Sequence, residues 1–206
     1  MRWLELRRRA AREPAETARW VVIDCETSGL DPRRDRLISL AGVGVKSRRI
    51  CPKDCFSRVL RQEQPSRREN ILVHGIGEQQ QSHGEMPEAA LAAFLAFADR
   101  APRVAYRAAF DRSVLERACG RRDRSPWLDL AQLLPVLFPA RGSPAATLDA
   151  WLEAFAVAHP ARHDALGDAY ATAQLFLVAL AECGRQGFRS VGAVLQAARA
   201  GRWTGR

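Results

Sequence analysis

The sequence has no apolar run that approaches the roughly 18 residues needed for a membrane-spanning helix, so no membrane association is expected. Its first residues, MRWLELRRRAAREPAE, are basic, but no long apolar segment follows them, which argues against a secretory signal peptide. The three glutamates and the lack of serine in this segment argue against a mitochondrial presequence. We expect residues 1–18 to form a basic arm or a short helix that buries Trp3, Leu6 and Ala10.

Cysteine is scarce, and the five cysteines are an odd number scattered along the chain. Only Cys51 and Cys55 are close together, and their spacing is not the CxxC of zinc or redox motifs. The pattern argues against a disulfide framework and predicts ordinary thiols in a reducing compartment, the cytoplasm.

Lysine is nearly absent, because Lys46 and Lys53 are the only lysines among 32 basic residues. These face 23 acids and give a net charge of +9. Arginine binds phosphate through paired hydrogen bonds and stacks on flat rings. A basic surface around acidic chemistry favours a polyanionic substrate such as nucleic acid. The alternative is that the arginine content reflects only overall composition and solubility.

The chain length suits a single domain with a substantial core, and no internal repeat or long low-complexity segment divides it. A short, turn-rich segment, SGLDPRRDR, separates the first two β-favouring stretches and predicts that they are antiparallel strands. Helical and strand patterns then alternate. This order predicts an α/β domain with a mixed sheet over residues 19–187, with a helical segment, residues 188–206, packed on it.

The expected elements follow from periodicity and from turn residues. We expect strands over residues 19–25, 37–45, 103–106 and 127–128, and a third strand or an irregular hairpin over 48–61. We expect helices over residues 87–99, 110–119, 148–156 and 165–183, a helix after the strand at 127–128, and a loop with at most a short helix over 69–86.

Two acids, Asp24 and Glu26, stand at the end of the first expected strand, in VVIDCETSGLD. Side chains two apart on a strand project from the same face, so both can converge on one cation. Asp111 follows a short strand at a helix start, and Asp168 lies near the start of a long apolar helix. Each acid alone is explained by the helix dipole or by exposure. Together, the four predict a divalent metal site, and oxygen ligands favour Mg²⁺ or Mn²⁺ over zinc.

His163 lies five positions before Asp168, and five residues on a helix turn about 140° past one face. We therefore expect His163 in the loop before the helix, with Asp164 as the N-cap. From there it can accept a proton from an attacking water, a role that suits imidazole because it titrates near neutrality. The sequence offers no such acidic neighbour to the other histidines, which are His74, His83 and His159. Of these three, only His74 is suspected of a role.

The motifs DCETSG, AAFD and HDALGD, in this order, resemble the DEDDh branch of 3′→5′ exonucleases. This is the family of the proofreading epsilon subunit of bacterial DNA polymerase III and of ribonuclease T. The resemblance covers about residues 19–183 and implies a ribonuclease H-like fold, which is a mixed sheet of about five strands with helices on both sides.

The resemblance also implies a role for each site residue. Asp24, Glu26 and Asp168 would hold the metal that carries the nucleophilic water. Asp111 would help Asp24 to hold a second Mg²⁺ or Mn²⁺ ion near the leaving oxygen, and His163 would be the general base. The product would be a nucleoside 5′-monophosphate, cut from the 3′ end of single-stranded nucleic acid, with DNA favoured over RNA.

Members of the family hold the terminal nucleotide with the turn after the first acids and with a His-Gly-Ile loop. Here these match the segment from Thr27 to Leu30 and the segment from His74 to Ile76. An amide near Thr27 would bond the 3′-hydroxyl, while Leu30 and Ile76 would present apolar edges to a base. The alternative is that these two apolar residues belong to the core. Phe110, within AAFD, is a further expected substrate contact.

One departure from the family pattern stands just before the central acid, where the family usually has His-Asn and this chain has Tyr106 and Arg107. The change spares every expected ligand and the base, and it bears on the supporting hydrogen bonds and on substrate preference. Arg107 would either contact phosphate or point away. Asp129, in WLDLAQLL, is a fifth acid in a similar setting, which we expect to cap a helix or to support the site.

Three functions remain open at this point. The first is a metal-dependent exonuclease for single-stranded DNA, and the second is an exoribonuclease such as ribonuclease T or oligoribonuclease. The third is a nucleic-acid-binding accessory of a polymerase without catalysis, which the presence of all four acids and the histidine argues against. Because only residues 188–206 follow the main domain, we expect a stand-alone or loosely associated enzyme, with polymerase association in replication or repair left open.

Overall fold

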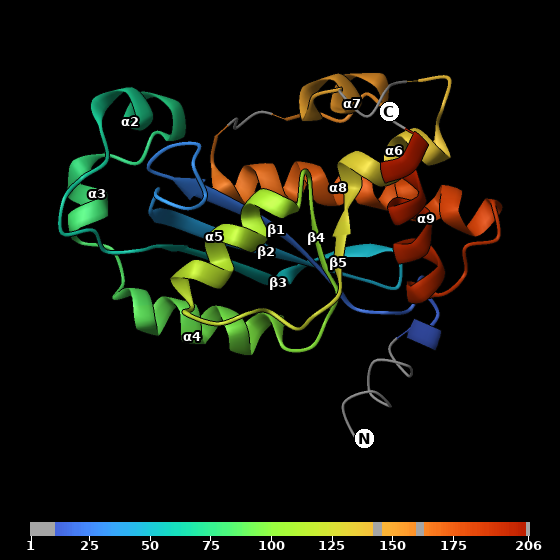
Figure 1. The fold of residues 1–206 in the computed structure, drawn as a ribbon, viewed down its shortest axis with the longest axis horizontal. Coiled ribbons are helices and arrows are strands. Elements are labelled where there is room, and N and C mark those ends of the chain that lie inside the picture. Colours follow the sequence, from blue (N-terminus) through green and yellow to red (C-terminus); the bar gives the residue numbers. More distant parts are fainter. Residues whose placement is uncertain (1–10, 142–145, 160–162, 205–206) are drawn as a thin grey trace.

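A computed structural model of the protein describes residues 11–141, 146–159 and 163–204, so Trp3, Leu6 and Ala10 of the expected N-terminal helix lie outside the described residues. The centre of the molecule is a five-stranded sheet with the order β3-β2-β1-β4-β5 (Figure 1). Its strands are β1 (Trp20–Thr27), β2 (Leu37–Lys46), β3 (Arg49–Val59), β4 (Arg103–Ala105) and β5 (Trp127–Asp129). The first three strands pair antiparallel, and β4 and β5 run parallel to β1. The sheet is therefore mixed, as predicted.

Helices cover both faces of the sheet (Figure 1). They are α2 (Arg68–His74), α3 (Glu78–Ser82), α4 (Pro87–Ala98), α5 (Ala109–Ala118), α6 (Leu130–Leu137), α7 (Leu148–Ala154), α8 (Ala165–Arg185) and α9 (Val191–Thr204). The segment expected to be a loop with at most a short helix contains two short helices, α2 and α3. Gly75 separates them, because its left-handed conformation (φ 68°) ends α2. Among the described residues, none of these helices combines the length and the apolar character needed to cross a membrane.

The alternation of side chains along β1 assigns them to two apolar cores. Trp20 and Val22 belong to the core under α8, while Val21 and Ile23 belong to the core under α4 and α5. The neighbouring strand β2 is buried on both faces over nearly its whole length. Gly42 permits this close packing, since a Cβ atom there would lie 2.6 Å from the ring of Phe97.

The contact between Trp20 and Phe176 sets the position of α8 on the sheet. The two rings meet edge to face at 5.1 Å between centroids, and both side chains are fully buried. From Phe176 back to Asp168, the helix rises about 12 Å. From Trp20 forward to Asp24, the strand rises about 13 Å. Because α8 runs antiparallel to β1, one aromatic contact brings the start of the helix to the acidic end of the strand.

Candidate metal centre

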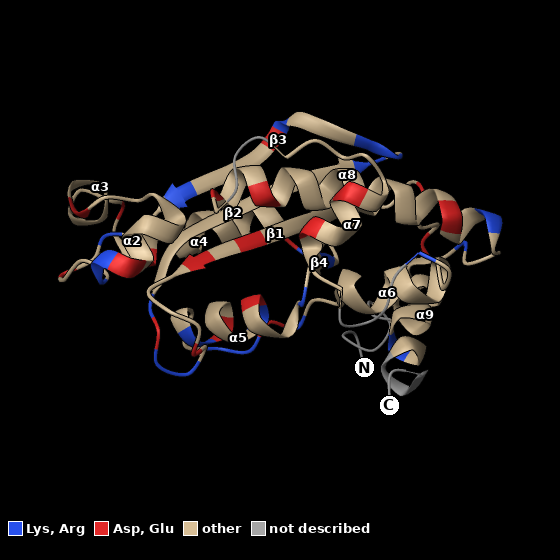
Figure 2. Cartoon of the chain, turned by 90° about the horizontal axis from the view of Figure 1, so that it is seen from above, with Lys and Arg blue, Asp and Glu red and all other residues tan. Residues whose placement is uncertain are grey.

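Three carboxylates meet where β1 ends and α8 begins. One oxygen each of Asp24, Glu26 and Asp168 lies within 4.8 Å of the others. Asp24 and Glu26 are half-buried, and Asp168 is only 5% exposed. Figure 2 shows the acidic end of β1 between α5 and α8. Carboxylates this close repel one another unless a cation separates them, so the arrangement suits a divalent ion.

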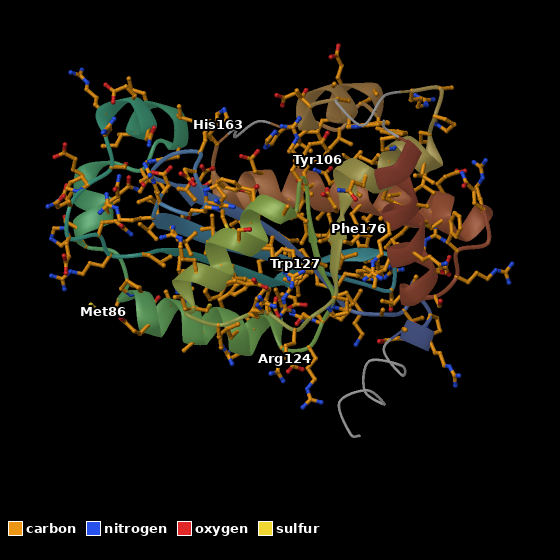
Figure 3. The ribbon with its side chains drawn as sticks, in the orientation of Figure 1. Met86, Tyr106, Arg124, Trp127, His163 and Phe176 are labelled. Carbon is orange, nitrogen blue, oxygen red and sulfur yellow. The ribbon has the colours of Figure 1, made fainter. Side chains whose placement is uncertain are left out.

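The start of α8 holds Asp168 in place. Asp164 is the N-cap of the helix, and its carboxylate accepts a hydrogen bond from the Gly167 N–H at 2.8 Å. The backbone N–H of His163 donates to Oδ2 of Asp168 at 2.9 Å. His163 itself lies in the loop before the helix with φ 59°, and its side chain is exposed (Figure 3). Its backbone therefore contacts the acidic group, and its side chain is not part of the core.

A second histidine, His159, also approaches the acids. Its Nε2 lies 2.9 Å from Oδ1 of Asp168, and both side chains are 7% exposed. The expectation that His159 has no acidic neighbour is therefore wrong. The contact depends on how the chain folds back before α8, which the sequence spacing does not reveal.

Asp111 comes from α5, on the other side of β1, and is not one of the three acids that lie within 4.8 Å of one another. It contacts Cys25, the residue between Asp24 and Glu26, through the thiol and the backbone. Burial raises the pKa of Asp111 from 3.8 to about 7, although hydrogen bonds to its carboxylate partly oppose this. Burial also raises the pKa of Cys25 well above its usual value, so the thiol remains protonated beside the acid.

The raised pKa of Asp111 predicts that the ionised acid destabilises the metal-free protein at high pH. The fold loses stability as the pH rises from the ordinary pKa of this acid, 3.8, to its raised folded value of about 7, and the loss is complete above that pH. We expect Asp111→Asn in EDTA to raise Tm by several degrees at pH 8, because about 1 kcal/mol shifts Tm by about 2–4 °C at this chain length. At pH 4, where the acid is protonated, the two proteins should melt within a degree of each other. Thermal scans at both pH values measure this, and an equal shift at both would contradict it.

The His-Gly-Ile loop is organised around the buried ring of His74. Its Nδ1 accepts a hydrogen bond from the Ile76 N–H at 3.0 Å, and its Nε2 lies 3.2 Å from the Ser66 hydroxyl. Burial lowers the pKa of His74, which agrees with a neutral ring that accepts at Nδ1. The structure therefore gives His74 the task of positioning Ile76, whose side chain is half-buried.

The other expected substrate contacts lie around the turn after β1 and at the start of α5. Leu30 is 92% exposed, so the alternative that it belongs to the core is wrong. The hydroxyl of Thr27 donates to the Gly29 carbonyl at 2.5 Å and closes the turn. Phe110, next to Asp111, is half-buried and packs against the core under α4 and α5.

The structure shows how Tyr106 and Arg107, the two residues that depart from the family pattern, are held. Arg107 has φ 59°, a conformation in which asparagine is enriched, and its backbone N–H donates to Oδ1 of Asp129 at 3.0 Å. Asp129 also caps α6 by accepting from the Ala131 N–H at 3.1 Å. Tyr106 donates its hydroxyl to the Ala146 carbonyl at 2.5 Å, and burial raises its pKa to about 12. The Arg107 side chain is exposed at the end of β4, beside the acidic end of β1.

Comparison with known proteins gives one family. The family model RNase_T, described as "Exonuclease", matches residues 21–176. A curated relative, the "DNA polymerase III subunit epsilon-like protein" of Rhodobacter capsulatus, is 32% identical over 191 residues, which cover 90% of this chain and 27% of the relative. The chain thus spans about a quarter of that relative's length.

Solved structures share the fold at lower identity. Exonuclease X in complex with 5′ overhanging duplex DNA superimposes with a TM-score of 0.69 at 22% identity, over 87% of this chain and 99% of that one. Escherichia coli exonuclease I in complex with a dT13 oligonucleotide gives a TM-score of 0.70 at 19% identity, over 83% of this chain and 43% of that one. The ribonuclease H-like fold expected from the sequence is thereby confirmed.

Proposed function

The chain belongs to the RNase_T exonuclease family, and from that premise we propose that it is a metal-dependent 3′→5′ exonuclease that hydrolyses single-stranded DNA to nucleoside 5′-monophosphates. The observation that carries the proposal is the group of three carboxylates within 4.8 Å of one another at the junction of β1 and α8. The family match spans all three segments that deliver the acids.

The residues present fit a pair of hard divalent cations. All four acids offer carboxylate oxygens, the ligands that Mg²⁺ and Mn²⁺ prefer. Asp24, Glu26 and Asp168 would hold one ion, and Asp24 with Asp111 would hold the other. When bound, two such ions activate a water and stabilise the attacking and leaving oxygens. A cation next to Asp111 would also remove the cost of ionising this buried acid.

The chain's own groups then bind the strand end and move the proton. His163, exposed beside Asp168, would accept the proton of the attacking water. The turn closed by Thr27 would present an amide to the 3′-hydroxyl. Leu30, exposed at this turn, and Ile76, held by the His74 ring, would flank the terminal base.

The choice of single-stranded DNA rests on relatives. Exonuclease I is solved with an oligonucleotide, dT13, and exonuclease X with duplex DNA that has a 5′ overhang. The curated relative is named for a DNA polymerase subunit. These names describe other proteins, and they support DNA as the first substrate to test.

A substrate panel tests the proposal. Matched single-stranded and duplex DNA and RNA oligomers, labelled at the 5′ end, are incubated with Mg²⁺, with Mn²⁺ or with EDTA. We expect a ladder that shortens one nucleotide at a time from the 3′ end of single-stranded DNA, with no products in EDTA. Faster digestion of RNA would make the enzyme an exoribonuclease, and no digestion with either metal would overturn the proposal.

A further inference from the structure

A large groove lies at the end of the sheet opposite the acids. It has a volume of about 1860 Å³ and is bordered by the starts of β1 and β4, the end of α4, the end of α5 and the loop before β5. Eight arginines and four acids line it. Figure 3 labels Arg124 and Trp127, which mark the loop and the start of β5 at this end of the molecule. The site described above accounts for none of this charge.

Two of the four acids of the groove, Asp123 and Glu116, form ion pairs within the fold. Arg103, which is 1% exposed, donates to the carbonyls of Ala98 and Asp99 at 2.7 and 2.8 Å, at the end of α4. Its Nε lies 3.5 Å from Asp123. On α5, Glu116 pairs with Arg112 at 2.8 Å. Because these pairs balance Arg103 and Arg112, the excess positive charge belongs to other side chains.

Much of the excess charge lies on the loop before β5, and Asp123 forms hydrogen bonds within this loop and to α5. The Asp123 carboxylate accepts hydrogen bonds from the Ser125 N–H at 2.9 Å and from the Trp127 indole N–H at 3.1 Å. The backbone N–H of Asp123 donates to the Glu116 carboxylate at 3.1 Å. Arg121 and Arg122, just before it, are exposed. A loop whose backbone is held in this way loses less backbone entropy when its arginines bind a ligand.

Three exposed arginines of the groove, Arg100, Arg121 and Arg122, form no ion pair within the part of the chain that the structure describes. Unpaired guanidinium groups bind phosphate oxygens through two parallel hydrogen bonds. Several of them along one groove match a ligand with repeated phosphates better than a single anion.

We propose that this groove is a second nucleic-acid site, which binds phosphates of the same strand several nucleotides from its 3′ end; this inference rests on the proposed function. Helix α5 connects the two sites, because Asp111 lies in its first turn while Arg121 and Arg122, the exposed arginines of the groove, follow its end. From Asp111 to Ala118 the helix rises about 10 Å. A stacked strand advances about 3.4 Å per nucleotide, so at least about three nucleotides separate Asp111 from Arg121 and Arg122.

The test compares charge reversal in the groove with charge reversal elsewhere. In Arg121→Glu/Arg122→Glu, both substitutions lie on the exposed loop. In the control, Lys46→Glu/Arg49→Glu, the same net charge is lost from the exposed β2–β3 hairpin. Binding of fluorescein-labelled dT20 and dT3 is measured in EDTA by anisotropy at several salt concentrations. Turnover of dT3 and dT20 is measured in Mg²⁺.

We expect the groove variant to bind dT20 at least 10-fold more weakly than the control does. Its slope of log K against log salt should fall by about 1.4, which is about 0.7 for each lost contact to a single strand. Turnover of dT3, which is too short to reach Arg121 and Arg122, should stay within twofold of wild type. Arg121→Gln/Arg122→Gln should show an intermediate loss, and it replaces the reversed variant if that fails to fold.

Two results would overturn the inference. One is an unchanged affinity of the groove variant for dT20, which would indicate that the arginines bind an acidic protein partner and not nucleic acid. The other is an equal loss of dT20 affinity in the control, which would mean that net charge, and not the groove, determines binding. If wild-type protein cleaves no substrate, the proposed function fails, while the dT20 binding comparison still decides the groove.

Discussion

Asparagine in place of Asp24 or Asp168 is expected to reduce mononucleotide release from single-stranded DNA by about 10³-fold or more. Each substitution keeps the shape of the side chain and removes one of the three charges that lie within 4.8 Å of one another. A metal centre supplies several kcal/mol of transition-state stabilisation, and about 4 kcal/mol corresponds to this loss. Turnover in Mg²⁺ measures the effect, and calorimetric titration with Mn²⁺ should show weaker metal binding in the same variants.

Asp164→Asn is the matched control for this prediction. Asp164 lies four residues before Asp168 on the same helix end, and its carboxylate caps α8 through the Gly167 N–H. Asparagine caps a helix about as well as aspartate. The control should therefore retain its Tm and most of its turnover. If Asp168→Asn were as active as Asp164→Asn, the cluster of three carboxylates at the junction of β1 and α8 would not be the metal centre.

The features that the sequence predicted well depend on local periodicity. Alternation in VVIDCET put Asp24 and Glu26 on one face of a strand, and β1 has this alternation, with Trp20 and Val22 on the face toward α8. The turn-rich segment before β2 predicted the antiparallel pairing that the register shows. The position of Asp164 before a long apolar run predicted the N-cap of α8. In each case, neighbours in the sequence decide the structure.

The features that the sequence could not predict depend on contacts across loops. The approach of His159 to Asp168 requires the path of the chain before α8, which no periodicity encodes. The contact between Asp111 and Cys25, and the resulting pKa of about 7, require the packing of α5 against β1. The same holds for Asp123, whose bonds shape the arginine groove. The composition shows the excess of arginine, but only the tertiary structure shows that eight arginines line one groove.

His163→Ala is expected to lower kcat by about 10²–10⁴-fold, the usual loss when a positioned general base is removed. The backbone N–H of His163 binds Asp168 and its side chain is exposed, so we expect the ring to accept a proton from a water at the proposed metal centre. Because the side chain is not part of the core, Tm should change by less than about 2 °C. Steady-state turnover of a single-stranded oligonucleotide provides kcat and KM separately, and we expect KM to change little.

The structure makes His159→Ala the informative comparison, because His159 also lies 2.9 Å from Asp168. Its ring is buried against the carboxylate, whereas the ring of His163 is exposed. We therefore expect His159→Ala to act on metal affinity and on Tm, with kcat at saturating Mg²⁺ reduced less than 10-fold. Added imidazole should partly restore the activity of His163→Ala and should not help His159→Ala, since a small base can enter only from the exposed side. Rescue of His159→Ala instead would transfer the role of the base to His159 and would place the attacking water on the buried side of Asp168.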